Sequence, residues 1–142
     1  MANEFIVKNG LISNGNTQTN GGLSLPSTNV RGSGTTTIDL TIDDFFVRAK
    51  PNGGELVTYR LPTNPSGSNQ SRNGQVLIIC VGNSPGDVTI TDSLGSILEP
   101  TSSLARNAIN IRGYNGNVTL YYDGDESKWV VTSTTGAITY SP

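Results

Sequence analysis

The chain has no histidine and a single cysteine, Cys80, among its 142 residues. Catalytic arrangements that need a histidine base, such as Ser-His-Asp and Cys-His, are therefore excluded. One cysteine cannot form a disulfide within the chain, and without histidine it cannot supply a zinc site. Cys80 has apolar neighbours on both sides, so we predict that it fills space in the core. We predict no catalytic residue, no bound metal and no cofactor.

Charged and apolar residues are both scarce. Only 14% of the residues are charged, against a usual value of about 25%, and the net charge is −2. The lysines and arginines form no cluster, which argues against nucleic-acid binding. Hydrophobic residues make up 34% of the chain. One copy is therefore expected to bury too little surface, and association between copies is a common remedy.

Long apolar runs are also missing. The longest, Val76–Val81, is far shorter than the ~20 residues of a membrane-spanning helix. The N-terminus has neither the basic segment nor the apolar stretch of a secretion signal. The sequence therefore predicts no membrane association and synthesis in a reducing cytoplasm.

Asparagine followed by glycine, in contrast, occurs six times. Both residues tolerate the positive φ angles that two-residue hairpin turns need. Runs rich in Val, Ile, Thr and Tyr around the later dipeptides favour short β-strands. The two signals together predict an all-β, antiparallel domain, a β-sandwich or jelly roll, without internal repeats. The expected strands are 36–42, 45–48, 56–61, 75–81, 87–91, 96–98, 108–112, 117–122, 128–133 and 137–140, and the last hairpin turns at 123–127.

Alternation along these strands selects the side chains that should face the core. The run at 75–81 is apolar throughout, so we expect a central strand buried on both faces. Tyr121 and Tyr122 are adjacent, so one should face the core and the other the surface or an interface. The core anchors selected from the pattern are Ile38, Leu40, Ile42, Val76, Ile78, Cys80, Leu120 and Trp129.

The composition changes near residue 34, where we divide the chain into an extended N-terminal arm, 1–33, and a β-domain, 34–142. Residues 14–22 have nothing to bury, and such a segment does not offset its ordering entropy alone. The arm is therefore either a flexible terminus or a segment that orders against a partner. Its apolar residues favour the second interpretation; they are Phe5, Ile6, Val7, Leu11 and Ile12.

Carboxylates gather at Asp123, Asp125 and Glu126. Two carboxylates that face each other in a cleft can hydrolyse a glycoside, and several can bind calcium. The spacing does not match an EF-hand loop, and aspartate commonly begins turns. We therefore predict that this cluster is the tip of a hairpin.

Two stretches, residues 3–13 and a second one within 55–133, resemble structural proteins of tailed bacteriophages. Residues 3–13, Asn-Glu-Phe-Ile-Val-Lys-Asn-Gly-Leu-Ile-Ser, are similar to the opening of many such proteins, notably those of marine and cyanobacterial phages. The second stretch, within 55–133, resembles a β-domain of phage fibres, head fibres and decoration proteins. Its features, in order, are the strand end Leu61-Pro62, Gly74-Gln75 before a buried strand, a turn with Asp123-Gly124, and a return strand with Trp129.

The resemblance implies a virion protein, usually trimeric. A chain of this length, with one arm and one β-domain and no shaft, is most similar to a capsid decoration (cement) protein on the capsid exterior. Its expected partners are the major capsid protein and its own copies, and it is expected to have no enzymatic activity. The arm would clamp capsid subunits, with Phe5, Ile6 and Val7 adding a strand to an exposed sheet edge.

Three alternatives remain open. A short fibre or knob that binds a host-surface glycan or receptor would present exposed aromatic rings. A polysaccharide-degrading enzyme would depend on a carboxylate such as Asp125. A cellular β-sandwich adhesion module is the third, although neither a secretion signal nor a pair of cysteines supports it.

Overall fold

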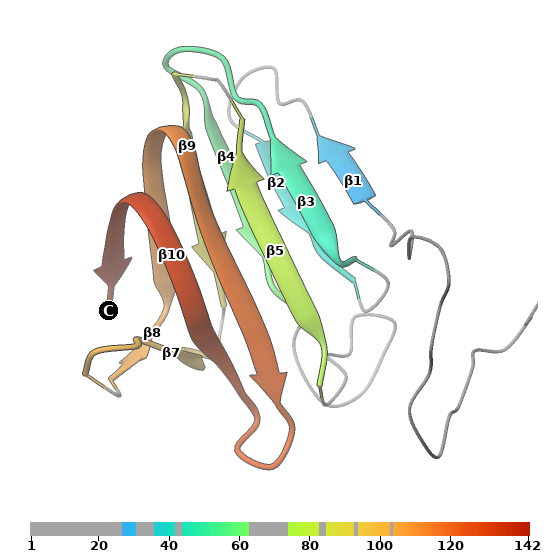
Figure 1. Cartoon of the computed structure of the whole chain (residues 1–142), viewed down its shortest axis with the longest axis vertical. Helices are drawn as coiled ribbons and strands as arrows, with labels where there is room; N and C mark the ends of the chain where they lie inside the picture. Colours follow the sequence, from blue (N-terminus) through green and yellow to red (C-terminus); the bar gives the residue numbers. More distant parts are fainter. Residues whose placement is uncertain are drawn as a thin grey trace, which may run out of the picture.

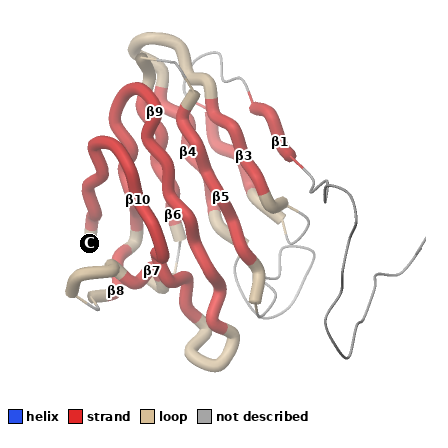
Figure 2. Tube along the Cα trace, viewed as in Figure 1, coloured by secondary structure: helices blue, strands red, loops and turns tan. Residues whose placement is uncertain are grey.

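The computed structural model of the chain describes residues 27–30, 36–41, 44–62, 74–82, 85–92, 94–102 and 104–142. Within these ranges the chain forms strands and no helix, which confirms the all-β prediction (Figure 1, Figure 2). The five apolar residues assigned to the arm, and the core anchor Ile42, lie outside the described residues. The strands are β1 Ser27–Val30, β2 Thr36–Asp39, β3 Phe46–Ala49, β4 Leu56–Arg60, β5 Val76–Val81, β6 Asp87–Thr91, β7 Ile97–Leu98, β8 Ala105–Arg106, β9 Ala108–Asp123 and β10 Lys128–Ser141.

All of these strands belong to one sheet that curls into a half-barrel. The curl passes through β9, which pairs with β6 along 108–111 and with β5 along 117–121. We call β1, β3, β5, β7 and the adjoining parts of β9 and β10 the front arm. The rear arm is formed by β2, β4, β6 and the first part of β9, and Figure 1 shows β2 and β4 behind the front strands.

The sheet is mixed, so the prediction of an antiparallel domain is wrong in this respect. Five of the nine strand pairs are parallel, including β1 with β3, β3 with β5, and β4 with β6. The reason lies in the turn after β3. Asn52-Gly53, followed by Gly54 at φ 79°, carries the chain from the front arm to the rear arm instead of closing a hairpin.

A unit of two successive strands, the first in the front arm and the second in the rear arm, therefore occurs three times, as β1–β2, β3–β4 and β5–β6. Its registers align Ser27 with Phe46 and Phe46 with Ile78. No repeat was predicted from the sequence, because the segments that connect these strands differ in length. β1 also lies inside the range assigned to the arm, so paired β-structure begins before residue 34.

Successive corners stack closely. A Cβ atom added to Gly86 would lie 2.5 Å from the carbonyl oxygen of Asn52 and 2.6 Å from Cβ of Pro51. Gly53 approaches Pro85 in the same place, with 3.3 Å between its hypothetical Cβ and Cγ of the proline. The corner after β5 therefore rests on the corner after β3, and glycine at 86 permits the contact.

β9 and β10 are each continuous where the sequence predicts two strands. Both strands bend as they pass from one arm to the other, and the register shifts between Thr135 and Ala137. Gly113, Asn115 and Gly136 adopt positive φ angles of 74°, 57° and 88° at this bend. Asn115-Gly116, which suggested a turn between two strands, therefore lies at a bend within β9, and the strand continues through it.

The core lies between the two arms. Leu40, Leu120 and Trp129 are among its buried residues, and Ile38 packs against it while partly exposed. On β5 the core anchors are wrong, because Leu77, Ile79 and Val81 point inward and Val76, Ile78 and Cys80 are half-buried on the outer surface. In a run that is apolar at every position, alternation does not indicate which set faces inward. The register decides, since it places Leu77 beside the buried Leu120.

Candidate functional site

The acidic cluster is a hairpin tip, as predicted. The carboxylate of Asp123 accepts hydrogen bonds from the backbone N–H groups of Asp125 (3.0 Å) and Glu126 (3.3 Å). Nζ of Lys128 lies 3.8 Å from Oε2 of Glu126. No group of three or more Asp, Glu, Cys or His side chains that could hold a metal ion occurs in the described part of the chain. The contacts of Asp123 are those of a residue that closes the turn.

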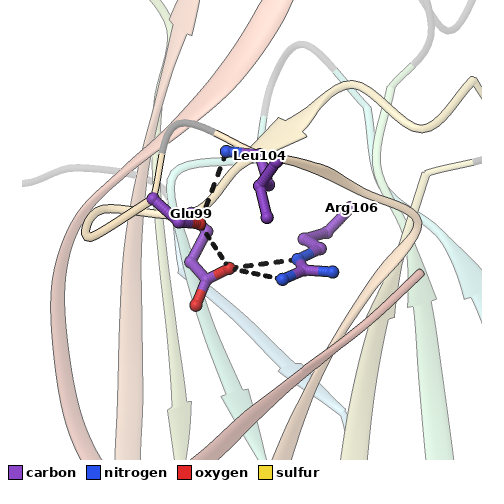
Figure 3. A network of polar contacts seen from close by, with 4 residues as sticks. Glu99, Leu104 and Arg106 are labelled. Carbon is purple, nitrogen blue, oxygen red and sulfur yellow. Dashed lines mark hydrogen bonds and ion pairs between the residues drawn. The ribbon is translucent and has the colours of Figure 1, made fainter.

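A polar network holds the β7–β8 hairpin together (Figure 3). Nε and Nη2 of Arg106 both donate to Oε2 of Glu99, at 3.0 and 2.9 Å, and the Ser102 hydroxyl donates to the same oxygen at 2.8 Å. These bonds from Ser102 and Arg106 hold the pKa of Glu99 below its usual value. The Glu99 carboxylate and the Arg106 guanidinium are therefore structural partners within the hairpin.

Asp92 is a buried carboxylate with a similar structural role, in the turn after β6. It is 3% exposed and accepts hydrogen bonds from the backbone N–H groups of Leu94 (3.2 Å) and Ser96 (2.9 Å) and from the Ser96 hydroxyl. A buried carboxylate that is satisfied by local donors organises its loop. Asp92 is therefore not a candidate catalytic group.

Two buried tyrosine hydroxyls, those of Tyr59 on β4 and Tyr122 on β9, have no hydrogen-bond partner among the residues that the structure describes. Burial raises the pKa of Tyr59 to about 12, because the charged form would be poorly solvated. The ring of Tyr122 packs against Trp129, with 5.1 Å between the ring centroids. Both rings contribute apolar packing, whereas both hydroxyls carry an uncompensated desolvation cost.

Tyr59→Phe is expected to increase the free energy of unfolding, by about 1–3 kcal/mol, because it removes a buried hydroxyl that bonds to none of the described residues. Urea denaturation measures the change. Tyr121→Phe is the control, since Tyr121 is 37% exposed and its hydroxyl is open to water. A loss of stability in Tyr59→Phe would show that the hydroxyl has a partner.

The outer surface of the front arm carries a cluster of apolar side chains beside polar ones, which include Arg48 and Thr119. The apolar side chains alternate with those that face the core, and they are half-buried except for the exposed Tyr121. We call this apolar cluster the front face; it consists of Phe46, Val76, Ile78, Leu98, Tyr121 and Val130. As predicted for adjacent tyrosines, Tyr122 faces the core and Tyr121 faces outward. The front face was not predicted from the sequence, because Val76 and Ile78 were assigned to the core.

The outer surface of the rear arm is different. Its outward positions on β2, β4 and β6 are polar with the exception of Leu56, which is 36% exposed. The outward polar residues there are Thr37, Asp39, Thr58, Arg60, Asp87, Thr89 and Thr91. A sheet surface in water normally has this polar composition. The front face is therefore the candidate functional site, because its composition suits contact with protein better than contact with water.

Single apolar side chains are also exposed elsewhere. Tyr114 is 56% exposed at the bend of β9, and Leu94 and Leu104 are 66% and 53% exposed beside β7 and β8. Isolated exposed apolar residues are common on proteins. Tyr114 differs in being an aromatic ring at the outer bend, a position from which it could contact a ligand.

No helix suited to crossing a membrane was found in the part of the chain that the structure describes. No protein-family model matches the sequence, and neither does any curated protein.

Proposed function

We propose that this chain is a non-enzymatic structural protein of a phage virion, a capsid decoration (cement) protein on the capsid exterior. The observation that carries the proposal is the apolar front face, because an apolar sheet surface is stabilised when protein covers it. The resemblance of residues 3–13 and of the strand motifs to phage structural proteins supplies the class of partner. The sandwich-like, trimeric assembly that this resemblance implies is part of the proposal.

In the proposed mechanism the β-domain provides a rigid body and the N-terminal arm provides attachment. Phe5, Ile6 and Val7 add a strand to an exposed sheet edge of the major capsid protein, where main-chain hydrogen bonds supply affinity. Many equivalent sites on one shell turn weak contacts into stable retention. Clamped capsid subunits then resist the pressure of packaged DNA.

Quantitative mass spectrometry of purified virions tests the role directly. A decoration protein is expected at a copy number that approaches that of the major capsid protein. A few copies per virion would overturn the decoration role, because they would place the chain on a tail or at a single vertex.

Deletion of residues 1–13 is expected to abolish binding to capsids while the β-domain stays folded, because it removes all five apolar residues assigned to the arm. Co-sedimentation with capsids that lack the protein measures binding, and circular dichroism checks the fold. Lys8→Ala is the control, since it leaves the apolar residues in place. Binding that survives the deletion would contradict the arm mechanism.

The second candidate function, a fibre or knob that binds a host-surface glycan, is favoured by one observation, the exposed ring of Tyr114. An exposed aromatic ring can stack on a sugar. This alternative predicts hits on a glycan array that are lost in Tyr114→Ala and kept in Leu104→Ala. An array without hits would argue against it.

A further inference from the structure

We propose that the two edges of the rear arm pair between neighbouring copies of this chain, so that residues 137–141 of β10 in one copy lie parallel to β2 of the next copy. Repeated around an axis that runs along the strands, this contact closes a ring of three copies. The pairing of the edges goes beyond the proposed function, whereas the number of three copies rests on the trimer that is part of it.

The rear arm has two edges at which a strand has a neighbour on one side only among the described residues. The strand order across it is β2, β4, β6, β9 and the end of β10. Figure 1 shows β2 and the C-terminal end of β10 at opposite sides of this arm. Residues 137–141, Ala-Ile-Thr-Tyr-Ser, include neither a charged residue nor a proline, which natural proteins use to protect an edge from pairing. This edge is therefore open to another strand.

The apolar side chains at the margin of the core lie on these same two edges. Among the described residues, three hydrophobic side chains pack against the core while only partly buried, Ile38 on β2 and Ile138 and Tyr140 on β10. Tyr59 and Ile90, which face inward from the strands between the edges, are fully buried because a strand lies on each side of them. A strand added to each edge would cover the three partly exposed side chains in the same way, and burial of apolar surface is favourable.

The directions of the two edge strands suit a head-to-tail contact. β10 and β6 both run antiparallel to β9, and β4 and β2 run parallel to β6, so the end of β10 and β2 point the same way. Rotation about an axis along the strands keeps this direction, and it therefore sets β2 of one copy parallel to β10 of the next. Pairing of like edges would need two copies in opposite orientations and would leave the other edge uncovered. A head-to-tail contact covers both edges and closes into a ring when the rotation allows it.

The strand registers place the two edges at the same level along the strands. One lateral row of outward side chains crosses all five strands, and it consists of Thr37, Thr58, Thr89, Asn110 and Thr139. Rotation about an axis along the strands leaves this level unchanged. Thr139 of one copy therefore meets Thr37 of the next on the outer surface, and Tyr140 meets Ile38 on the inner surface. The inner contact joins two of the side chains that remain partly exposed in one copy.

Disulfide trapping of the full chain tests this contact. Thr37→Cys and Thr139→Cys are combined in a Cys80→Ser background, and the protein is oxidised at high concentration. The expected products are species of two and three chains, because neighbouring strands lie about 4.8 Å apart, within the Cα range of a disulfide. Within one copy the two positions are four strand spacings apart, about 19 Å, so they cannot join there.

Three controls make the trapping specific. Thr37→Cys alone and Thr139→Cys alone should give no linked species, because like edges do not meet in a head-to-tail contact. Thr58→Cys with Thr139→Cys should also give none, since Thr58 is an outward residue of β4 and not of an edge strand. The absence of linked chains in the Thr37→Cys/Thr139→Cys protein, linked pairs in either single variant, or products longer than three chains would overturn the proposal.

A pair of charge variants tests the same contact without a covalent bond. Thr37 and Thr139 are both exposed, so neither substitution disturbs the core. In sedimentation equilibrium, Thr37→Lys with Thr139→Lys should associate roughly tenfold or more weakly than Thr37→Lys with Thr139→Glu, because each contact sets like charges opposite each other in the first protein and opposite charges in the second. Equal association of the two proteins would contradict the pairing. The copy number in virions is measured separately, so a failure here is distinguishable from a failure of the decoration role.

Discussion

Gly116→Ala is expected to destabilise the fold by about 3 kcal/mol or more, because it overpacks the bend of β9. A Cβ atom at this position would lie 2.3 Å from Cγ2 of Ile111. Ile111 is fully buried and β-branched, so its methyl group cannot rotate away without a clash elsewhere. The midpoint of urea denaturation measures the effect, which is a large part of the ~5–15 kcal/mol that stabilises a typical domain.

Two further variants identify the cause. Gly113→Ala is the control, since its added Cβ would meet nothing within 4 Å and would carry only the strain of its positive φ, about 1–2 kcal/mol. Ile111→Ala removes the atom that clashes, so adding it to Gly116→Ala should cost less than the sum of the two single changes. If the changes are simply additive, the contact between Gly116 and Ile111 is not the reason for glycine at this position.

Trp129→Ala is expected to lower the free energy of unfolding by about 3–5 kcal/mol, because it removes the largest buried side chain of the core and leaves a cavity. Trp129 is 1% exposed, packs against Tyr122, and donates a hydrogen bond from Nε1 to the carbonyl oxygen of Pro62 at 3.3 Å. That bond joins the start of β10 to the end of β4, which lies in the opposite arm. The substitution therefore weakens the contact between the two arms as well as the local packing.

Trp129→Phe separates these contributions, because it keeps an aromatic ring beside Tyr122 and removes the indole N–H. Its expected cost is smaller than that of Trp129→Ala by about 1–3 kcal/mol, since most of the buried volume remains. Tyr121→Ala serves as the surface control on the neighbouring strand. If Trp129→Ala lowers the free energy of unfolding by less than about 1 kcal/mol, Trp129 does not hold the front arm and the rear arm together.

Local patterns in the sequence were sufficient to predict that the fold is all-β. Alternation of apolar and polar residues located most of the strands, and Asp123 identified the tip of the last hairpin, because strand and turn preferences depend on neighbouring residues. Leu40 and Trp129 were assigned to the core correctly, since each belongs to a strand with a distinct apolar pattern. The front face was not found, although Tyr121 indicated an outward aromatic ring.

Only the tertiary structure decided which strands pair and which face of β5 is buried. Asn52-Gly53 suggested a hairpin turn, but the positive φ lies at Gly54, and the segment forms a corner between the two arms on which Gly86 packs against Pro51. Val76 and Leu77 are equally apolar in character, so the choice between them depends on the register against Leu120, 43 residues along the chain from Leu77. The sequence by itself therefore determined an all-β chain that has no histidine and one cysteine. The long-range register determined its mixed sheet, its three stacked units and the outward position of the apolar front face.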